Sequence, residues 1–530
     1  MSTIEVATAE PTAPHRACSQ LMIMGLPDAT LHRLILGLDG RPQQLVDGDA
    51  LAQLGDDFAT LLLREGVFPR TAGEVLAGLV SATPDGHPLR TQRFFLVGEG
   101  SQIPRQAARP VARNLRFVVA CGRGPEGANI ILSSFHPDQG VVEVIAWDSA
   151  AGGFNFYRTM PDSSAWVFAG NSRHALVGPT RGNGPFESHV NGHFLMKELN
   201  VPWVNWHSPF ATVSVSVLAE QGLEFHPWVA RLEPGGAYTL EDDIARPAIQ
   251  RWTKARVSAM SAGTALETPR RFAEQLLDTL TVNLISSRTS SAAAMSGAAA
   301  TVDLPASFFV DAASLELVGV LPDPPAFRVA ADVYTAVMRS VGARLDDGAG
   351  FTVDGDTHFA FVIPERAAED VETVRQAVAA GIFTQRLVAC LLMVDFPNPL
   401  FSSLRPRLLT FFPEESFSGD GVSFSTAVAE RILASPEAEE SGAAEAEFAQ
   451  LWRVGENFQA PFTDRLTTYF AALEEQLSSQ SGFDAYVRLA ESRRAFVLEM
   501  PIAESALLFA RTTVTPARRT MTVAGMVEEA

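Results

Sequence analysis

The chain has 530 residues, 47% of them hydrophobic and 19% charged, which is the composition of a globular protein of about two to four domains. Its formal net charge is −20 and no stretch is rich in lysine or arginine, which argues against a nucleic-acid partner because phosphate binding needs clustered basic charge. Three widely spaced cysteines argue against a disulfide framework; without a signal peptide or a run of about 20 apolar residues, we expect a cytoplasmic protein with no membrane partner.

The first 91 residues predict a tail followed by a small helical unit. Residues 1–27 mix Ser, Thr, Ala, Pro and Glu, a composition typical of a disordered tail. Over 28–91, apolar residues recur at intervals of three and four in LHRLILGL, DALAQLGDDFATLLLREG and TAGEVLAGLVSA, which predicts helices. Thr71 is placed to cap the last of them.

Residues 92–285 predict a β-meander that leads into a core rich in histidine and tryptophan. The hydrophobic period falls toward two in short runs such as RFVVACG, ANIILSSF and VVEVIAW, and AWDSAAGGFNFYR predicts a hairpin around Gly152 and Gly153. Gly122, Gly124 and Gly127 match a dinucleotide-binding fingerprint. A strand-like run follows them in place of the required helix, so they predict a turn between strands.

The C-terminal half predicts a second unit and a helical pair. The low-complexity run 286–301 is typical of a linker or mobile loop. Residues 302–434 alternate helix and strand signals, with a predicted hairpin at 350–364, and residues 447–515 predict two helices that dock by their apolar faces. We therefore expect an α+β fold, with an antiparallel sheet core wrapped by helices and helical units at the N- and C-terminal ends.

The segment 166–228 is rich in histidine and tryptophan, whose side chains can ligate a metal or hold a cofactor. Five of the ten histidines and four of the seven tryptophans fall inside it. Histidine is the commonest metal ligand, and large aromatic rings can wall a flat ligand. We therefore predict a cofactor or metal site in the His-rich part, 174–226.

His189 and His193 are the predicted metal ligands. Residues four apart share one face of a helix, and Glu187 beside them is a candidate ligand or base. Asn191 and Gly192 lie between the two histidines and favour a turn, so the alternative is that each ring hydrogen-bonds a backbone group. The same alternative applies to His174, His207 and His226, of which the first two are also candidate cofactor ligands.

Other residues of this segment have candidate roles in holding a flat cofactor. Trp203 and Trp206 are walls of the predicted pocket, or else core anchors. Arg173, with Arg158 and Arg181, is placed to clamp an acidic substrate or a propionate. Met196 is a candidate soft ligand, although filling the core is the usual role of methionine.

Nucleophilic catalysis has little support in the sequence. Ser172 and Ser188 lie near histidines but neither stands in a GxSxG motif. Cys121 or Cys390 would need a depressed pKa to act as a nucleophile.

Four segments, AWDSAAGGFNFYR, WVFAGNS, PFESHVNGHFLMKEL and PWVNWHSP, together resemble a little-characterised group of bacterial cytochrome c-like proteins. TVNLISSR, LPASFFVD and VDFPNPLFSS are also similar to that group, so the likeness is scattered over 140–405. Where the group has CxxCH, this chain has Phe186-Glu187-Ser188-His189, which excludes thioether attachment of haem. The resemblance implies non-covalent haem with His189 as an axial ligand.

These observations lead to a leading function and its alternatives. The leading hypothesis is a haem- or metal-dependent oxidoreductase that acts on a small molecule, with His193, His174 or His207 as second ligand or acid–base group and Glu187 orienting a histidine. The alternatives are a cofactor-free binding or scaffold protein and a metal-assisted hydrolase. A protein partner or a second copy is expected to use the C-terminal helices.

Overall fold

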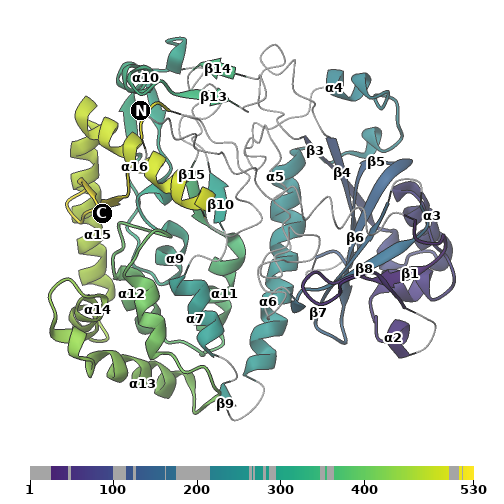
Figure 1. Ribbon diagram of the computed structural model, residues 1–530, viewed down its shortest axis with the longest axis horizontal. Coiled ribbons are helices and arrows are strands. Elements are labelled where there is room, and N and C mark those ends of the chain that lie inside the picture. The colour runs from purple at the N-terminus through teal and green to yellow at the C-terminus, as the bar shows by residue number, and fades with distance from the viewer. Residues whose placement is uncertain are drawn as a thin grey trace, which may run out of the picture.

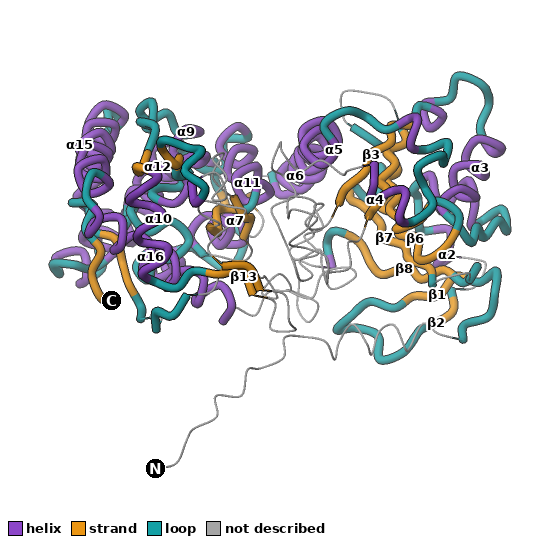
Figure 2. The backbone as a smooth tube through the Cα atoms, turned by 90° about the horizontal axis from the view of Figure 1, so that it is seen from above, coloured by secondary structure: helices purple, strands orange, loops and turns teal. Residues whose placement is uncertain are grey.

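The computed structural model describes residues 25–45, 49–98, 115–122, 127–160, 163–174, 215–261, 265–266, 269–278, 282–285, 294–346, 352–354, 363–499, 512–515 and 517–530. These residues form two lobes (Figures 1 and 2). The N-terminal part builds a sheet lobe, the C-terminal half builds a helical lobe, and helix α6 (Arg246–Met260) runs between them. The predicted α+β class is confirmed.

The sheet lobe contains eight described strands in the order β2-β1-β8-β7-β6-β5-β4-β3. Neighbours from β3 to β8 follow one another in sequence and pair antiparallel, so the predicted meander is confirmed. β1 pairs antiparallel with β2 and parallel with β8. The strands are β1 Leu31–Arg33, β2 Gln43–Gln44, β3 Gln92–Gly98, β4 Leu115–Cys121, β5 Ile130–His136, β6 Gln139–Asp148, β7 Gly153–Thr159 and β8 Trp166–Asn171.

Both faces of this sheet are covered, which explains why apolar residues occupy successive as well as alternate positions in runs such as VVEVIAW. Successive side chains of a strand point to opposite faces. In β6, Val144 and Ala146 belong to the core of the first face, whereas Ile145 and Trp147 belong to that of the second. A polar residue on either face would lose its water, so both sets are apolar.

The first face packs against the N-terminal helices α2 (Asp49–Ala52), η1 (Ala59–Leu63) and α3 (Ala72–Ala82). The Thr71 hydroxyl accepts the N–H of Glu74 at 3.2 Å, so the predicted cap is confirmed. The helix predicted over LHRLILGL is wrong, because its first residues form β1. Pairing with two strands overrides the local helical period there.

The turns of the meander agree with the sequence. Asp148 pairs with Gly153 at the predicted β6–β7 hairpin, where Gly152 has a φ of 61°, a value that glycine adopts without strain. Gly122 and Gly127, the described glycines of the 122–127 motif, lie between β4 and β5, which pair antiparallel. No helix can therefore follow the motif, because β5 begins at Ile130.

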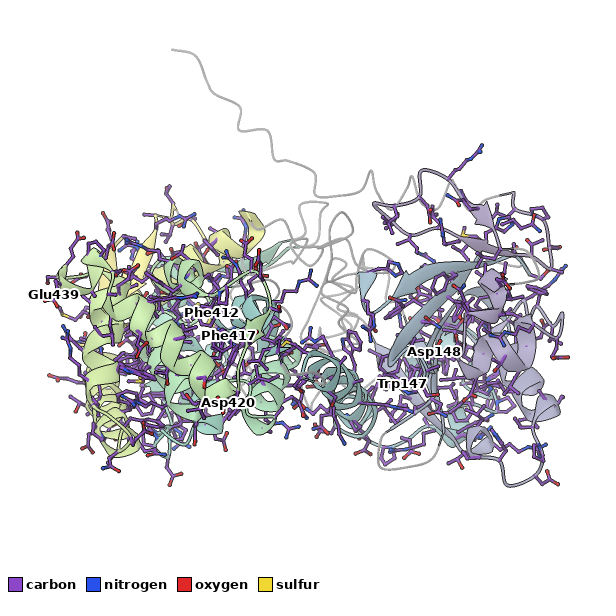
Figure 3. The ribbon with its side chains drawn as sticks, turned by 90° about the horizontal axis from the view of Figure 1, so that it is seen from below. Trp147, Asp148, Phe412, Phe417, Asp420 and Glu439 are labelled. Carbon is purple, nitrogen blue, oxygen red and sulfur yellow. The ribbon has the colours of Figure 1, made fainter. Side chains whose placement is uncertain are left out.

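Asp56 anchors the N-terminal helices to the sheet. Its carboxylate is fully buried, accepts the N–H of Ala59 at 2.9 Å, and also accepts hydrogen bonds from Tyr157 and from Asn155 Nδ2, the latter at 2.8 Å. Nearby Asp148 (labelled in Figure 3) accepts the N–H of Gly55 at 2.7 Å. Burial raises the pKa of Asp56, and these donors partly offset that rise.

The second face packs against one continuous helical stretch made of α5 (Gly236–Leu240), η7 (Glu241–Ala245) and α6. Ile249 and Trp252 of α6 join the core of this face. The opposite side of α6 packs on α11 (Ala368–Ala379) of the helical lobe. The sequence DDIARPAIQRWTKARVSAM, 242–260, predicts a helix; α6 confirms it and contacts both lobes.

The helical lobe is built on helices with short two-stranded ladders between them. Its helices are α7 Pro269–Leu277, α9 Ala312–Leu317, α10 Ala331–Ser340, α11, α12 Gln385–Met393, α13 Gly421–Leu433, α14 Ala444–Arg453, α15 Gln459–Leu477 and α16 Gln480–Glu499. Its strands are β9 Ala265–Leu266, β10 Val282–Ile285, β11 Thr301–Asp303, β12 Arg328–Ala330, β13 Arg344–Asp346, β14 Thr352–Asp354, β15 Ile363–Arg366, β16 Phe417–Ser418, β17 Arg519–Met521 and β18 Val527–Glu529. The short 3₁₀ turns among the described residues are η2 Pro88–Arg90, η6 Val229–Arg231, η8 Ala306–Phe308, η9 Arg405–Phe411 and η10 Pro436–Glu439. Helix α4 (Val215–Glu220) belongs to the sheet lobe.

One prediction for this lobe is wrong. The predicted C-terminal pair of helices is a set of three, since a glycine turn at Val454 and Gly455 separates α14 from α15. The hairpin predicted at 350–364 falls largely on residues 355–362, which lie outside the described part of the chain, so it stays a prediction. Of its described residues, those of β14 pair with β13 and those of β15 pair with β10.

Residues 394–405, which we call the junction loop, run from α12 to η9 within the helical lobe and reach the core on the second face of the sheet. Asp395 and Leu400 have φ values of 48° and 67°, which non-glycine residues rarely adopt. Leu400 joins the apolar core of the second sheet face, while Asn398 holds β17 through two hydrogen bonds to the backbone of Met521. Loop, sheet and C-terminal strand therefore meet here.

Within the described residues, no helix has both the length and the apolar composition needed to cross a bilayer.

Candidate functional site

The predicted cofactor site falls mostly on residues 175–214, which lie outside the described part of the chain. Seven of its nine residues are in that range: Glu187, His189, His193, Met196, Trp203, Trp206 and His207. Arg181 lies there too. The haem or metal hypothesis for these residues stays a prediction.

Arg173 and His174, the two described members, close the turn after β8. Arg173 Nη2 donates to the carbonyl of Ala151 at 2.9 Å, and His174 Nδ1 accepts the N–H of Asn171 at 3.0 Å. Burial lowers the pKa of His174. A neutral ring with Nδ1 as acceptor carries its proton on Nε2, so ligation of a metal through Nε2 would require the other tautomer and the loss of this bond.

The other described rings of the segment have structural partners. His226 Nδ1 accepts the N–H of Trp228 at 3.2 Å, and its Nε2 lies 3.2 Å from the carboxylate of Asp138. Trp166 is fully buried and donates to the carbonyl of Pro69, and Trp228 packs edge-on against Phe94. Hydrogen bonding to the backbone, the alternative for these histidines, is what the structure shows for His174 and His226.

Two further site types find no support in the described residues. No group of three or more His, Cys, Asp or Glu side chains among them is arranged to hold a metal ion. Burial raises the pKa of Cys121 and of Cys390 to about 12, which is opposite to the low pKa that a thiolate nucleophile needs.

A groove on the outer side of the helical lobe is a candidate binding site that the sequence did not indicate. It lies between η10 and α14 on one side and the start of α15 on the other, and its volume of about 700 Å³ suits a small organic molecule. Glu439, on its rim, lies at the outer edge of the lobe (Figure 3). The lining residues are Leu404, Ala438, Glu439, Ser441, Gly442, Ala443, Ala446, Glu447, Gln450, Leu451, Arg453, Val454, Pro461, Phe462 and Arg465.

Small and apolar side chains form much of this lining. Ala443, Ala446, Leu451 and Phe462 are all buried. The two alanines leave space above α14 that a longer side chain would fill. These side chains are already largely shielded from water, so an apolar group would be held mainly by close contact with them.

The charged side chains that line the groove form two arginine–glutamate pairs. Arg465 Nη2 lies 2.7 Å from Glu447 Oε1, with the two side chains 33% and 23% exposed, and Arg453 lies 3.6 Å from Glu439. In the described part of the chain, Arg465 donates a hydrogen bond to Glu447 alone. A guanidinium offers five N–H donors, so Arg465 retains donors for an anionic ligand.

Behind the groove, the buried arginine Arg405 satisfies the end of α12. It donates to the carbonyls of Val394 and Leu392 at 2.7 and 2.6 Å. Burial lowers the pKa of Arg405 to about 10, so the group is still charged at neutral pH. Burial also raises the pKa of neighbouring Asp395.

Sequence patterns did not reveal this groove. The run SPEAEESGAAEAE at 435–447 indicated only compositional bias, although it supplies the alanines of the lining and Glu447. Arg465 lies on a different helix, and its pairing with Glu447 depends on how α14 and α15 pack. Alanines that repeat beside charged residues are the one local signal that could have drawn attention to it.

No protein-family model, curated protein or solved structure matches this chain. The resemblance to cytochrome c-like proteins is therefore untested and stays a prediction.

Proposed function

We propose that this chain binds a small organic anion with an apolar body in the groove between α14 and α15. The observation that carries this proposal is the partly exposed Arg465 guanidinium beside a buried apolar lining in a groove of about 700 Å³. The anionic group would accept hydrogen bonds from Arg465, and the apolar body would lie against Ala446 and Phe462. This is the cofactor-free binding protein among the functions considered from the sequence.

Calorimetry with a matched series of ligands tests the proposal. Hexanoate and phenylacetate carry the anion and the apolar body, their amides lack the charge, and acetate lacks the body. We expect the two larger carboxylates to bind more tightly than their amides and than acetate. A charge-assisted hydrogen bond contributes about 1.5–3 kcal/mol, so the carboxylate should gain roughly tenfold to a hundredfold in Kd. Equal affinity for acid and amide would contradict the role of Arg465.

Three variants test whether the ligands bind in the groove. Arg465→Gln should weaken binding of the carboxylates by roughly tenfold or more and leave the amides unchanged, since only the charge-assisted bond is lost. Ala446→Leu should abolish binding of all of them by filling the space. Arg488→Gln is the matched control: Arg488 forms a similar pair with Asp484 on α16, and neither residue lines the groove. Loss of binding in Arg488→Gln would place the ligand elsewhere.

A further inference from the structure

The ion pair of the groove also holds the junction loop. Glu447 Oε1 pairs with Arg465 at 2.7 Å, whereas Glu447 Oε2 accepts the backbone N–H of Asp395 at 3.0 Å. Asp395 has a φ of 48°, so this hydrogen bond supports a backbone conformation that costs free energy. One carboxylate therefore links a residue of the groove to the first turn of the loop.

Two more contacts join the groove to the loop. The Arg465 guanidinium lies 5.0 Å from the ring centroid of Phe396. At the other end of the loop, Leu404 lines the groove directly, and Arg405 beside it ties the loop to the end of α12. The groove thus contacts both ends of the segment 394–405.

The middle of the loop faces away from the groove toward other parts of the fold. Leu400 packs into the core on the second face of the sheet. Phe401 stacks edge-on with Phe496 of α16, their ring centroids 5.5 Å apart, and Asn398 binds Met521 of β17. A change at the ends of the loop would reach the contact between the two lobes through Leu400.

We infer that the groove regulates the junction loop: an anion bound to the remaining donors of Arg465 shares the guanidinium with Glu447, weakens their ion pair and so loosens the hold of Glu447 on Asp395. The inference rests on the proposed function for its ligand, but the Glu447 link itself can be tested without one. Binding would then weaken the packing of Leu400 in the apolar core that it shares with α6 and the sheet, so that occupancy of the groove alters the contact between the lobes.

Hydrogen exchange of the backbone amides, read by mass spectrometry on peptides that cover 395–401, tests the link in the ligand-free protein. Glu447→Ala should speed exchange of this segment, in which the amides of Asp395, Asn398 and Phe401 are hydrogen-bonded, by roughly tenfold because one supporting bond is lost. Glu439→Ala removes a carboxylate from the same groove without a contact to the loop and should leave exchange unchanged. Equal exchange in both variants would overturn the inference.

If Glu447→Ala does not fold, Arg465→Gln replaces it, because it removes the partner of Glu447 and keeps the carboxylate. The ligand arm repeats the measurement with phenylacetate at saturation as determined by calorimetry. Faster exchange of 395–401 supports the coupling, and binding without any change there refutes it while leaving the proposed function intact. If phenylacetate does not bind, the proposed function fails and the ligand-free variants alone decide the link.

Discussion

At the residue scale, helix caps set by neighbouring residues could be predicted from the sequence, whereas contacts between residues far apart in the chain could not. Thr71 caps α3, as predicted, because a cap depends on the few residues beside it. Asp56 gave no such signal: its partners Asn155 and Tyr157 lie on β7, about a hundred residues away, and only the packed sheet brings them together.

Tyr157→Phe should destabilise the protein in a way that depends on pH. The hydroxyl of Tyr157 donates to the buried Asp56 carboxylate, and its loss should cost about 1–3 kcal/mol when Asp56 is charged. It should also raise the pKa of Asp56 further, so the cost should shrink as the pH falls and Asp56 takes up a proton. Urea unfolding at several pH values measures this.

Tyr469→Phe is the matched control for that experiment. Its hydroxyl is also buried but donates to the carbonyl of Phe309 at 3.1 Å, which does not titrate. We expect a cost that does not change between acidic and neutral pH. A pH-independent cost for Tyr157→Phe as well would show that Asp56 stays in one protonation state throughout.

Three histidines should make the fold less stable in mild acid. Burial lowers the pKa of His32, His136 and His174 below the ordinary value near 6.5. The unfolded chain then binds more protons than the fold, so this contribution is complete above about pH 6.5 and is lost as the pH falls below it. Replacing all three by glutamine should flatten the pH dependence of the urea midpoint between about pH 7.5 and 5.5, and an unchanged slope would contradict the assignment.

At the scale of elements, the meander and the long helices were predictable because period and turn residues fix them locally. The β6–β7 hairpin and α6 follow the predicted pattern. The error at Leu31–Arg33 concerns a short segment whose conformation depends on β8, far along the chain. Periodicity over a few residues cannot identify that partner.

Asn398→Ala should release the C-terminal strand β17 from the junction loop. The side chain of Asn398 satisfies both the N–H and the carbonyl of Met521, at 2.8 and 2.9 Å, and all of these atoms are buried or nearly so. Losing these bonds, and the bond that Asn398 Nδ2 donates to the Asp395 carboxylate at 2.7 Å, should cost about 2–3 kcal/mol in urea unfolding. Asn398→Asp keeps the acceptor but turns an oxygen toward the Met521 carbonyl and the Asp395 carboxylate, so at neutral pH it should cost at least as much as alanine. A smaller cost for Asn398→Asp than for Asn398→Ala would contradict the donor role of the amide.

At the scale of the whole molecule, the fold class followed from the sequence and the candidate site did not. The histidines that directed attention to 166–228 are backbone-bonded wherever the structure describes them, at His174 and His226. The groove depends on the packing of α14 against α15, a relation that no single stretch encodes. The haem hypothesis for 175–214 is independent of the groove and has its own test.

If haem binds through His189, protein reconstituted with haem should show a Soret band that His189→Ala abolishes. His87→Ala is the control, because the His87 ring accepts the N–H of Leu89 in a turn outside the predicted site. A spectrum identical to free haem for the unmodified protein would end the hypothesis without bearing on anion binding.

The parallel pairing of β1 with β8 affects how the chain folds during its synthesis. The hydrogen bond from Ala29 to Ser164, just before these strands, spans 135 residues. At a translation rate of roughly 5–20 residues per second, β1 would wait on the order of ten seconds for β8 to leave the ribosome. Chaperones that bind nascent chains would therefore meet the N-terminal strand before its partner exists.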